Sequence, residues 1–267
     1  QLAKRRRAPL DLYPEIARAA LSRWLAPLRA LWRRTWFYRR LLGGPLADRI
    51  PFNPYDAQPR KLEDAEALLR GRFRFAGESV DVKEGSIFDV APPSPAWADA
   101  LHSFEWLPPL AMAGGDPART LATNLISQWI KRHSRYCEPA WLPHVLAARL
   151  VHLFAHGRFA ITNSDLLWRS KLFVSLREQS RMLARVAGDA PDGIPRLEAA
   201  AGLALSGACL DDSPRRLAAG IQRLVEEISR QILPDGGHVS RSPKALLDAY
   251  RHIVMVVDAL KARDQEV

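Results

Sequence analysis

Beyond residue 95, apolar residues recur every three or four positions, which is the period of amphipathic helices. Glycine and proline interrupt the pattern at intervals that end one helix and begin the next. The pattern predicts seven helices, near residues 96–113, 117–134, 140–156, 164–187, 195–209, 213–232 and 243–263. Helices of this length joined by short connections form antiparallel helical hairpins.

Two stretches of this region are apolar on more than one face, residues 145–154 and 199–205. A helix that is apolar all round is buried among other helices. We expect these two, together with residues 101–112, to form an inner layer inside an outer layer of amphipathic helices. This arrangement predicts an all-α fold, an incomplete (α/α) toroid, and a generic helical bundle is the alternative.

The preceding residues follow a different pattern. A short helix is expected over 61–70. Between Gly71 and Gly77 aromatic and polar residues alternate, which is the period of a β-strand. A small β-hairpin is therefore expected near 72–82, with almost no other sheet in the chain.

The N-terminal segment carries most of the net charge of +10, since residues 1–50 contain 12 Lys and Arg but 3 acids. Residues 21–42 are also amphipathic, with Trp24, Trp32 and Phe37 among the arginines. Three interpretations remain open: a helix that packs on the protein, a segment that docks on an anionic membrane, and a nucleic-acid-binding segment. Nucleic acid is the least favoured, because no zinc spacing or recognised binding motif is present. We expect a basic segment over 1–58 and a helical domain over 59–267.

Metal and cofactor sites are not expected. The two cysteines, Cys137 and Cys209, have no metal-ligand spacing around them. His152 and His156 lie one helical turn apart but lack the glutamate of a zinc-protease motif. No glycine-rich phosphate loop is found, and no apolar run is long enough for a transmembrane helix.

The polar segment over residues 231–243 joins two helices and is the first candidate site. His238 is a candidate base, or a turn histidine that bonds to a helix end. Arg241 is a candidate ligand for a substrate carboxylate, or the partner of a nearby acid. Tyr250 is a candidate catalytic residue if its helix turns it into a cleft, and otherwise packs in the core.

A second group of candidates surrounds residues 101–107. His102 and Glu105 lie one helical turn apart and together offer a base and an acid for substrate binding. Trp106 and Trp141 offer flat apolar faces for stacking on sugar rings. Core packing is the alternative for both tryptophans.

Several short motifs occur in an order that resembles the heparinase II/III-like polysaccharide lyases. They are residues 101–107 followed by Gly114 and Gly115, then 141–144, 147–150, 197–205 and 231–243. The resemblance covers roughly residues 60–265. In this family a helical toroid comes first and a β-sandwich domain follows it, so the resemblance implies a helical toroid here. This chain ends at Val267, where that domain is expected to begin, so the missing domain is an expected partner.

The resemblance also implies a function, which is β-elimination on an acidic, uronate-containing polysaccharide, and a location in the bacterial cell envelope or periplasm. Three family positions are not matched: residues 193–195 stand where the family has Asn and His, the family's Tyr falls near Ala245, and its acidic residue falls on Ser240. The expected function is therefore a polysaccharide lyase domain. The alternatives are a non-catalytic acidic-glycan-binding or envelope protein on the same scaffold, or a basic module that binds membrane or nucleic acid.

Overall fold

The structure, a computed structural model, describes residues 28, 31–44, 46–47, 49–162, 164–210 and 214–266 of the 267-residue chain. The chain divides into two compact units, residues 1–41 and 42–267. None of the helices among the described residues is long and apolar enough to span a lipid bilayer.

In the first unit, residues 31–33 are helical and helix α2 covers Trp36–Leu41. A turn separates them, because the hydroxyl of Thr35 bonds to the carbonyl of Trp32 (2.7 Å) and accepts the amide of Tyr38 (3.3 Å). The side chains of Trp32 and Trp36 are 51% and 60% exposed. Trp24 and the basic residues before it lie outside the described residues.

The second unit begins with an extended segment, followed by helix α3 (Leu62–Leu69) and the expected hairpin of β1 (Arg72–Phe75) and β2 (Glu78–Asp81). Phe73 and Phe75 alternate with exposed arginines and point into the core. The turn at Ala76 and Gly77 has positive φ at both residues, as a tight two-residue hairpin requires.

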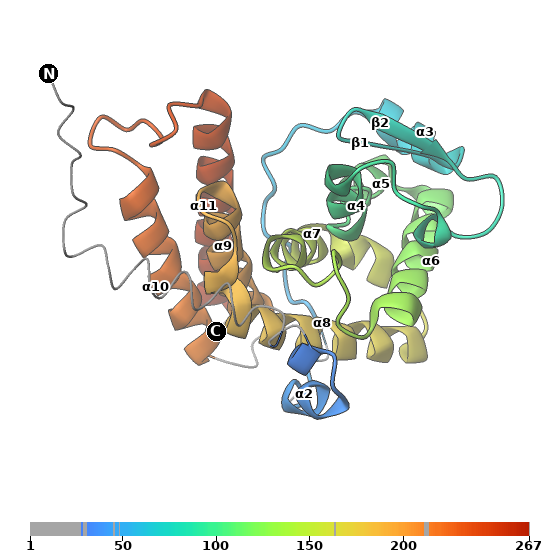
Figure 1. Cartoon of the computed structure of the whole chain (residues 1–267), viewed down its shortest axis with the longest axis horizontal. Helices are drawn as coiled ribbons and strands as arrows, with labels where there is room; N and C mark the ends of the chain where they lie inside the picture. Colours follow the sequence, from blue (N-terminus) through green and yellow to red (C-terminus); the bar gives the residue numbers. More distant parts are fainter. Residues whose placement is uncertain are drawn as a thin grey trace, which may run out of the picture. The chain divides into compact units, whose positions relative to one another are not determined.

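Eight α-helices follow, which confirms the expected all-α, toroid-like fold class of the described chain (Figure 1). They are α4 (Pro95–His102), α5 (Leu107–Ala113), α6 (Gly115–His133), α7 (Pro143–Ile161), α8 (Leu166–Val186), α9 (Ile194–Cys209), α10 (Pro214–Gln231) and α11 (Pro243–Glu266). Two short 3₁₀ turns are also present: Ile87–Asp89 precedes α4, and Ala187–Asp189 lies between α8 and α9. The expected helix over 96–113 is in fact two helices.

The inner helices are α7 and α9. Helix α9 packs against α7, α10 and α11, and the last two lie close to it in Figure 1. Every residue from Ala199 to Cys209 is buried, as the apolar pattern predicts. Helices α9 and α10 approach closely because Gly207 and Gly220 have no side chain. A Cβ at Gly220 would lie 2.3 Å from the backbone nitrogen of Ala204.

The turn between α4 and α5 is held by Arg149 of α7, whose side chain is fully buried. Its guanidinium donates to the carbonyls of His102 (2.8 Å) and Ala140 (2.7 Å) and lies 4.1 Å from the centre of the Trp129 ring. Burial lowers the pKa of Arg149 to about 9, which leaves it charged at neutral pH. Phe104 takes a left-handed conformation (φ 64°) in this turn, so α4 cannot continue into α5.

Candidate functional site

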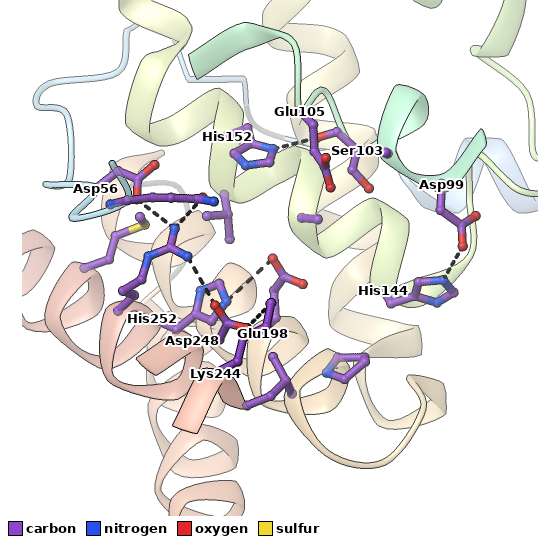
Figure 2. A pocket seen from close by; sticks show the side chains of 18 of the residues that line it. Asp56, Asp99, Ser103, Glu105, His144, His152, Glu198, Lys244, Asp248 and His252 are labelled. Atoms are coloured by element: carbon purple, nitrogen blue, oxygen red, sulfur yellow. Dashed lines mark hydrogen bonds and ion pairs between the residues drawn. The ribbon is translucent and has the colours of Figure 1, made fainter. Parts of the chain in front are cut away.

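A polar cavity of about 540 Å³ opens where several inner-helix ends meet in the second unit. Four helices and the extended segment before α3 contribute to its wall (Figure 2). Its ionisable lining residues are Asp56, Arg60, Asp99, Glu105, His144, His152, Glu198, Lys244, Asp248, Arg251 and His252. Its size lies within the usual range for a small-molecule site, but charged side chains are far more frequent than such sites require.

Asp56 organises one wall of the cavity. Its carboxylate, 4% exposed, accepts hydrogen bonds from Arg60 (3.1 Å), His156 (3.1 Å) and Arg251 (3.1 Å), and from the backbone amide of Gln58 (3.0 Å). Burial alone would raise the pKa of Asp56, but the bonds from His156 and Gln58 and the charge of Arg60 lower it well below its usual range. The carboxylate is therefore ionised and holds both guanidinium groups in place.

Helix α11 supplies the second wall through residues spaced to share one face. Lys244 and Asp248 are one turn apart, and Nζ of Lys244 lies 2.7 Å from the Asp248 carboxylate. Arg251, a turn further on, contacts Asp248 (3.3 Å) and donates to the side chain of Gln58 (2.6 Å). Lys244 is 85% exposed, so its ammonium stands at the mouth of the cavity and can reach a ligand.

Glu198 and His252 face each other on the inner side. Nε2 of His252 lies 3.7 Å from Oε1 of Glu198, near the start of α9. Burial, with the nearby carboxylates of Glu105 and Asp248, raises the pKa of Glu198 to about 8. Burial and the charge of Arg251 lower the pKa of His252 to about 4. At neutral pH the pair is therefore mainly a carboxylic acid beside an uncharged imidazole.

The α4–α5 turn places Glu105 and Ser103 at the cavity. The Ser103 carbonyl bonds to Nδ1 of His152 on α7 (2.8 Å), which fixes the orientation of that ring. Burial lowers the pKa of His152 to about 3. The surrounding protein raises the pKa of the exposed Glu105 carboxyl by desolvation, against the opposing charges of Arg60 and Lys244.

Four buried nitrogen atoms of the cavity residues have no hydrogen-bond partner in the described structure. They are Nε of Arg60, Nδ1 of His144, Nε of Arg251 and Nδ1 of His252. A buried polar atom without a partner is unfavourable by about 1–3 kcal/mol, so such atoms are rare unless water or a ligand satisfies them. The cavity therefore offers several unused hydrogen-bonding groups to a polar ligand.

Of the seven site residues expected from the sequence, the structure brings Glu105 to this cavity. His238 is buried and bonds to Ser240 (2.7 Å) and Gln231 (3.1 Å) within its own turn. Arg241 is exposed and paired with Asp235 at 2.5 Å. Neither is a lining residue, so the geometry matches the turn histidine and the local ion pair that were the alternatives. Tyr250 is 58% exposed and also lies outside the cavity lining.

The other three expected residues belong to the aromatic core. Trp106 has no exposed surface, packs on Phe104 and donates to the Leu101 carbonyl (3.2 Å). Trp141 is buried and donates to the carbonyl of His133 (2.8 Å). Stacking on a sugar requires an open ring face, which neither tryptophan has. His102 is buried too, and its Nδ1 accepts the indole N–H of Trp129 (3.2 Å).

Most of the cavity residues were not identified from the sequence, although the sequence around Glu198 and His152 gave some indication of them. Glu198 is the single acid within the otherwise apolar stretch 197–205. A buried carboxyl requires a partner or a function, which marks it as a candidate. The spacing of His152 and His156 suggested a pair of metal ligands. In the structure His152 instead bonds to the carbonyl of Ser103, and His156 bonds to the carboxylate of Asp56.

Comparisons with known proteins give one curated relative and one solved fold. The chain is 30% identical to FtsZ-localized protein C of Caulobacter vibrioides (strain NA1000 / CB15N) over 237 residues, 86% of this chain and 40% of that protein. The chain thus spans about two fifths of the length of that relative. No family model matches the sequence.

The solved structures of heparan sulfate lyase HepC from Pedobacter heparinus and of a mutant of it are similar to this chain. Each has a TM-score of 0.56 and covers 85% of this chain and 42% of the lyase, at 21% and 20% sequence identity. At this identity the likeness concerns the fold. It supports the expected resemblance for the helical part, which here adopts a lyase-like helical fold.

Proposed function

We propose that this chain is a glycan-binding domain on a lyase-like helical scaffold, and that the cavity between α4, α7, α9 and α11 binds an acidic glycan. The observation that carries the proposal is the density of polar groups in the cavity, including unpartnered nitrogens. Sugar hydroxyls both donate and accept, so mixed carboxyl, imidazole and guanidinium groups suit them. The likeness of the helical fold to a heparan sulfate lyase supports an acidic glycan as the partner.

Binding without elimination is the form of this proposal that the chemistry favours. Elimination needs a base that removes a proton from carbon near neutral pH. Neither Tyr nor Asn is among the residues that line the cavity. His152 and His252 have pKa values lowered to about 3 and about 4, and imidazoles of such low pKa are weak bases.

Lys244 provides the test of the binding proposal. Isothermal titration calorimetry with a uronate-containing oligosaccharide should detect binding to the 267-residue chain. Replacing Lys244 by Ala should weaken it about fivefold, roughly 1 kcal/mol, because Lys244 is a solvent-exposed cation that is expected to pair with the uronate. An absorbance assay for unsaturated uronate should show no product.

Two single-residue variants, one of a lysine and one of an arginine, serve as matched controls. Lys171→Ala removes an exposed lysine on α8, and Arg241→Ala removes the exposed arginine of the 231–243 turn. Neither residue lines the cavity, so both variants should bind like the unmodified chain. Equal losses in all three variants would show that binding follows overall charge, and the cavity assignment would fail. Accumulation of unsaturated product would refute binding without elimination.

A second partner is proposed for the N-terminal segment, the surface of an anionic membrane. Leu31, Trp32, Trp36 and Phe37 are each more than half exposed, and arginines lie among them in the sequence. Apolar side chains interleaved with cations are the composition of interfacial segments. Nucleic acid remains the less favoured polyanion, since no recognised binding motif accompanies the charge.

Vesicle sedimentation tests this second partner. The chain should sediment with vesicles that contain phosphatidylglycerol, and less so as salt rises from about 0.05 M to about 0.5 M, because the Debye length shortens. Deleting residues 1–40 should abolish the effect while leaving glycan binding intact. Unchanged sedimentation of the deletion variant would contradict the proposal.

A further inference from the structure

The Lys and Arg side chains of the cavity all contact carboxylates, but not all of its carboxyls contact Lys or Arg. Arg60 and Arg251 both contact Asp56, and Lys244 and Arg251 both contact Asp248. Each of the three cations therefore already has a carboxylate within the protein. Two groups remain available to an acidic ligand. They are the ammonium of Lys244, which is largely in solvent, and the N–H groups of Arg60 that do not contact Asp56.

Two further acids of the cavity differ from Asp56 and Asp248, which pair with Lys or Arg, and from Asp99, which pairs with His144 at 3.3 Å. Among the described residues, no Lys or Arg forms a salt bridge with Glu105 or Glu198, and the nearest basic group to Glu198 is the imidazole of His252, at 3.7 Å. That imidazole is uncharged at neutral pH, as its low pKa indicates. Glu105 comes from the α4–α5 turn and Glu198 from α9, and both carboxyls line the same cavity (Figure 2).

Ionising both carboxyls together is unfavourable, and without a ligand Glu198 stays mainly protonated at neutral pH. Burial is the main cause of the raised pKa of Glu198, and the charge of Glu105 adds to it because nearby carboxylates repel each other. His252, whose Nε2 lies 3.7 Å from Glu198, also has a buried Nδ1 without a partner in the described structure. A group that supplies positive charge and several N–H donors would satisfy the two carboxyls together.

We propose that the cavity selects acidic glycans whose amino sugar carries a free ammonium group, and that this group binds between Glu105 and Glu198. The inference rests on the proposed glycan-binding function. An ammonium has a positive charge and three donors, so it can bond to both carboxyls. An N-acetyl group has no charge, and one N–H, so it leaves the carboxyls uncompensated. Lys244 at the mouth then remains for the carboxylate of the neighbouring uronate.

A matched pair of oligosaccharides tests the selection. One is a uronate–glucosamine oligomer with free amines, and the other is the same oligomer after N-acetylation. Calorimetry on the 267-residue chain should show about tenfold tighter binding of the free amine at pH 7. Binding of the ammonium should also lower the pKa of Glu198 from about 8 and release protons, so the measured heat should depend on the buffer. The N-acetylated oligomer should show no such dependence.

Variants of the two acids complete the test. Glu105→Gln and Glu198→Gln should each reduce the preference to about twofold, with the N-acetylated oligomer bound as before. Glu84→Gln makes the same substitution at an exposed position outside the cavity and should leave the preference intact. Thermal unfolding confirms that each variant is folded. Equal affinity for the two oligomers would overturn the selection and leave glycan binding standing, whereas binding of neither oligomer would overturn both.

Discussion

A Gly220→Ala variant is expected to lose about 3 kcal/mol of unfolding free energy, at the upper end of the cost of overpacking. The added Cβ would lie 2.3 Å from the backbone nitrogen and 2.5 Å from the Cα of Ala204. Backbone atoms cannot move aside as a flexible side chain can, so α10 would have to shift away from α9. Thermal unfolding followed by circular dichroism should show a midpoint about 6–12 °C lower.

Ala219→Ser provides the control on the same helix. Ala219 is exposed and neighbours Gly220, so a slightly larger side chain there meets solvent and should change stability by less than about 0.5 kcal/mol. Full stability of Gly220→Ala would mean that α9 and α10 do not approach as closely as described. The inner position of α9 would then be in question.

Trp106→Ala should lower the unfolding free energy by about 3–5 kcal/mol, as large-to-small changes of buried tryptophan do. The Trp106 ring is fully buried against Phe104, with a centroid separation of 4.6 Å, and its indole N–H bonds to the carbonyl of Leu101. Urea unfolding measures the loss. Glycan affinity, measured on the folded fraction at low temperature, should not change, because the ring does not line the cavity.

Trp36→Ala is the matched control, since that tryptophan is 60% exposed. Its loss should cost less than about 0.5 kcal/mol. If Trp106→Ala retained its stability and lost glycan binding, the sequence-based expectation that Trp106 stacks on sugar would be right and its placement in the core would be wrong.

The fold followed closely from the hydrophobic pattern, because burial of apolar faces dominates the choice among helical arrangements. The all-round apolar character of residues 199–205 predicted a buried inner helix, and α9 confirms it. The break between α4 and α5 was missed. It falls at Phe104, shortly before Pro108 and Pro109 in the first turn of α5, and Arg149 reaches this turn from α7. A contact so distant in sequence leaves no local signal.

The site was harder to predict, because local polarity does not reveal whether a side chain already has a partner. The 231–243 segment drew attention through His238 and Arg241. The structure satisfies both within the same turn, through Ser240 and Asp235. The cavity residues instead come from segments up to 199 positions apart, as with Asp56 and Met255. Only the fold brings those segments together, so periodicity alone could not group them.

The central claim is that the polar cavity binds an acidic glycan, and a crystal structure of the chain soaked with the free-amine uronate oligomer tests it most directly. The account predicts sugar density in the cavity, with a carboxylate near Lys244 and the amine between Glu105 and Glu198. Sugar bound elsewhere on the chain, with the cavity holding only water, would contradict it.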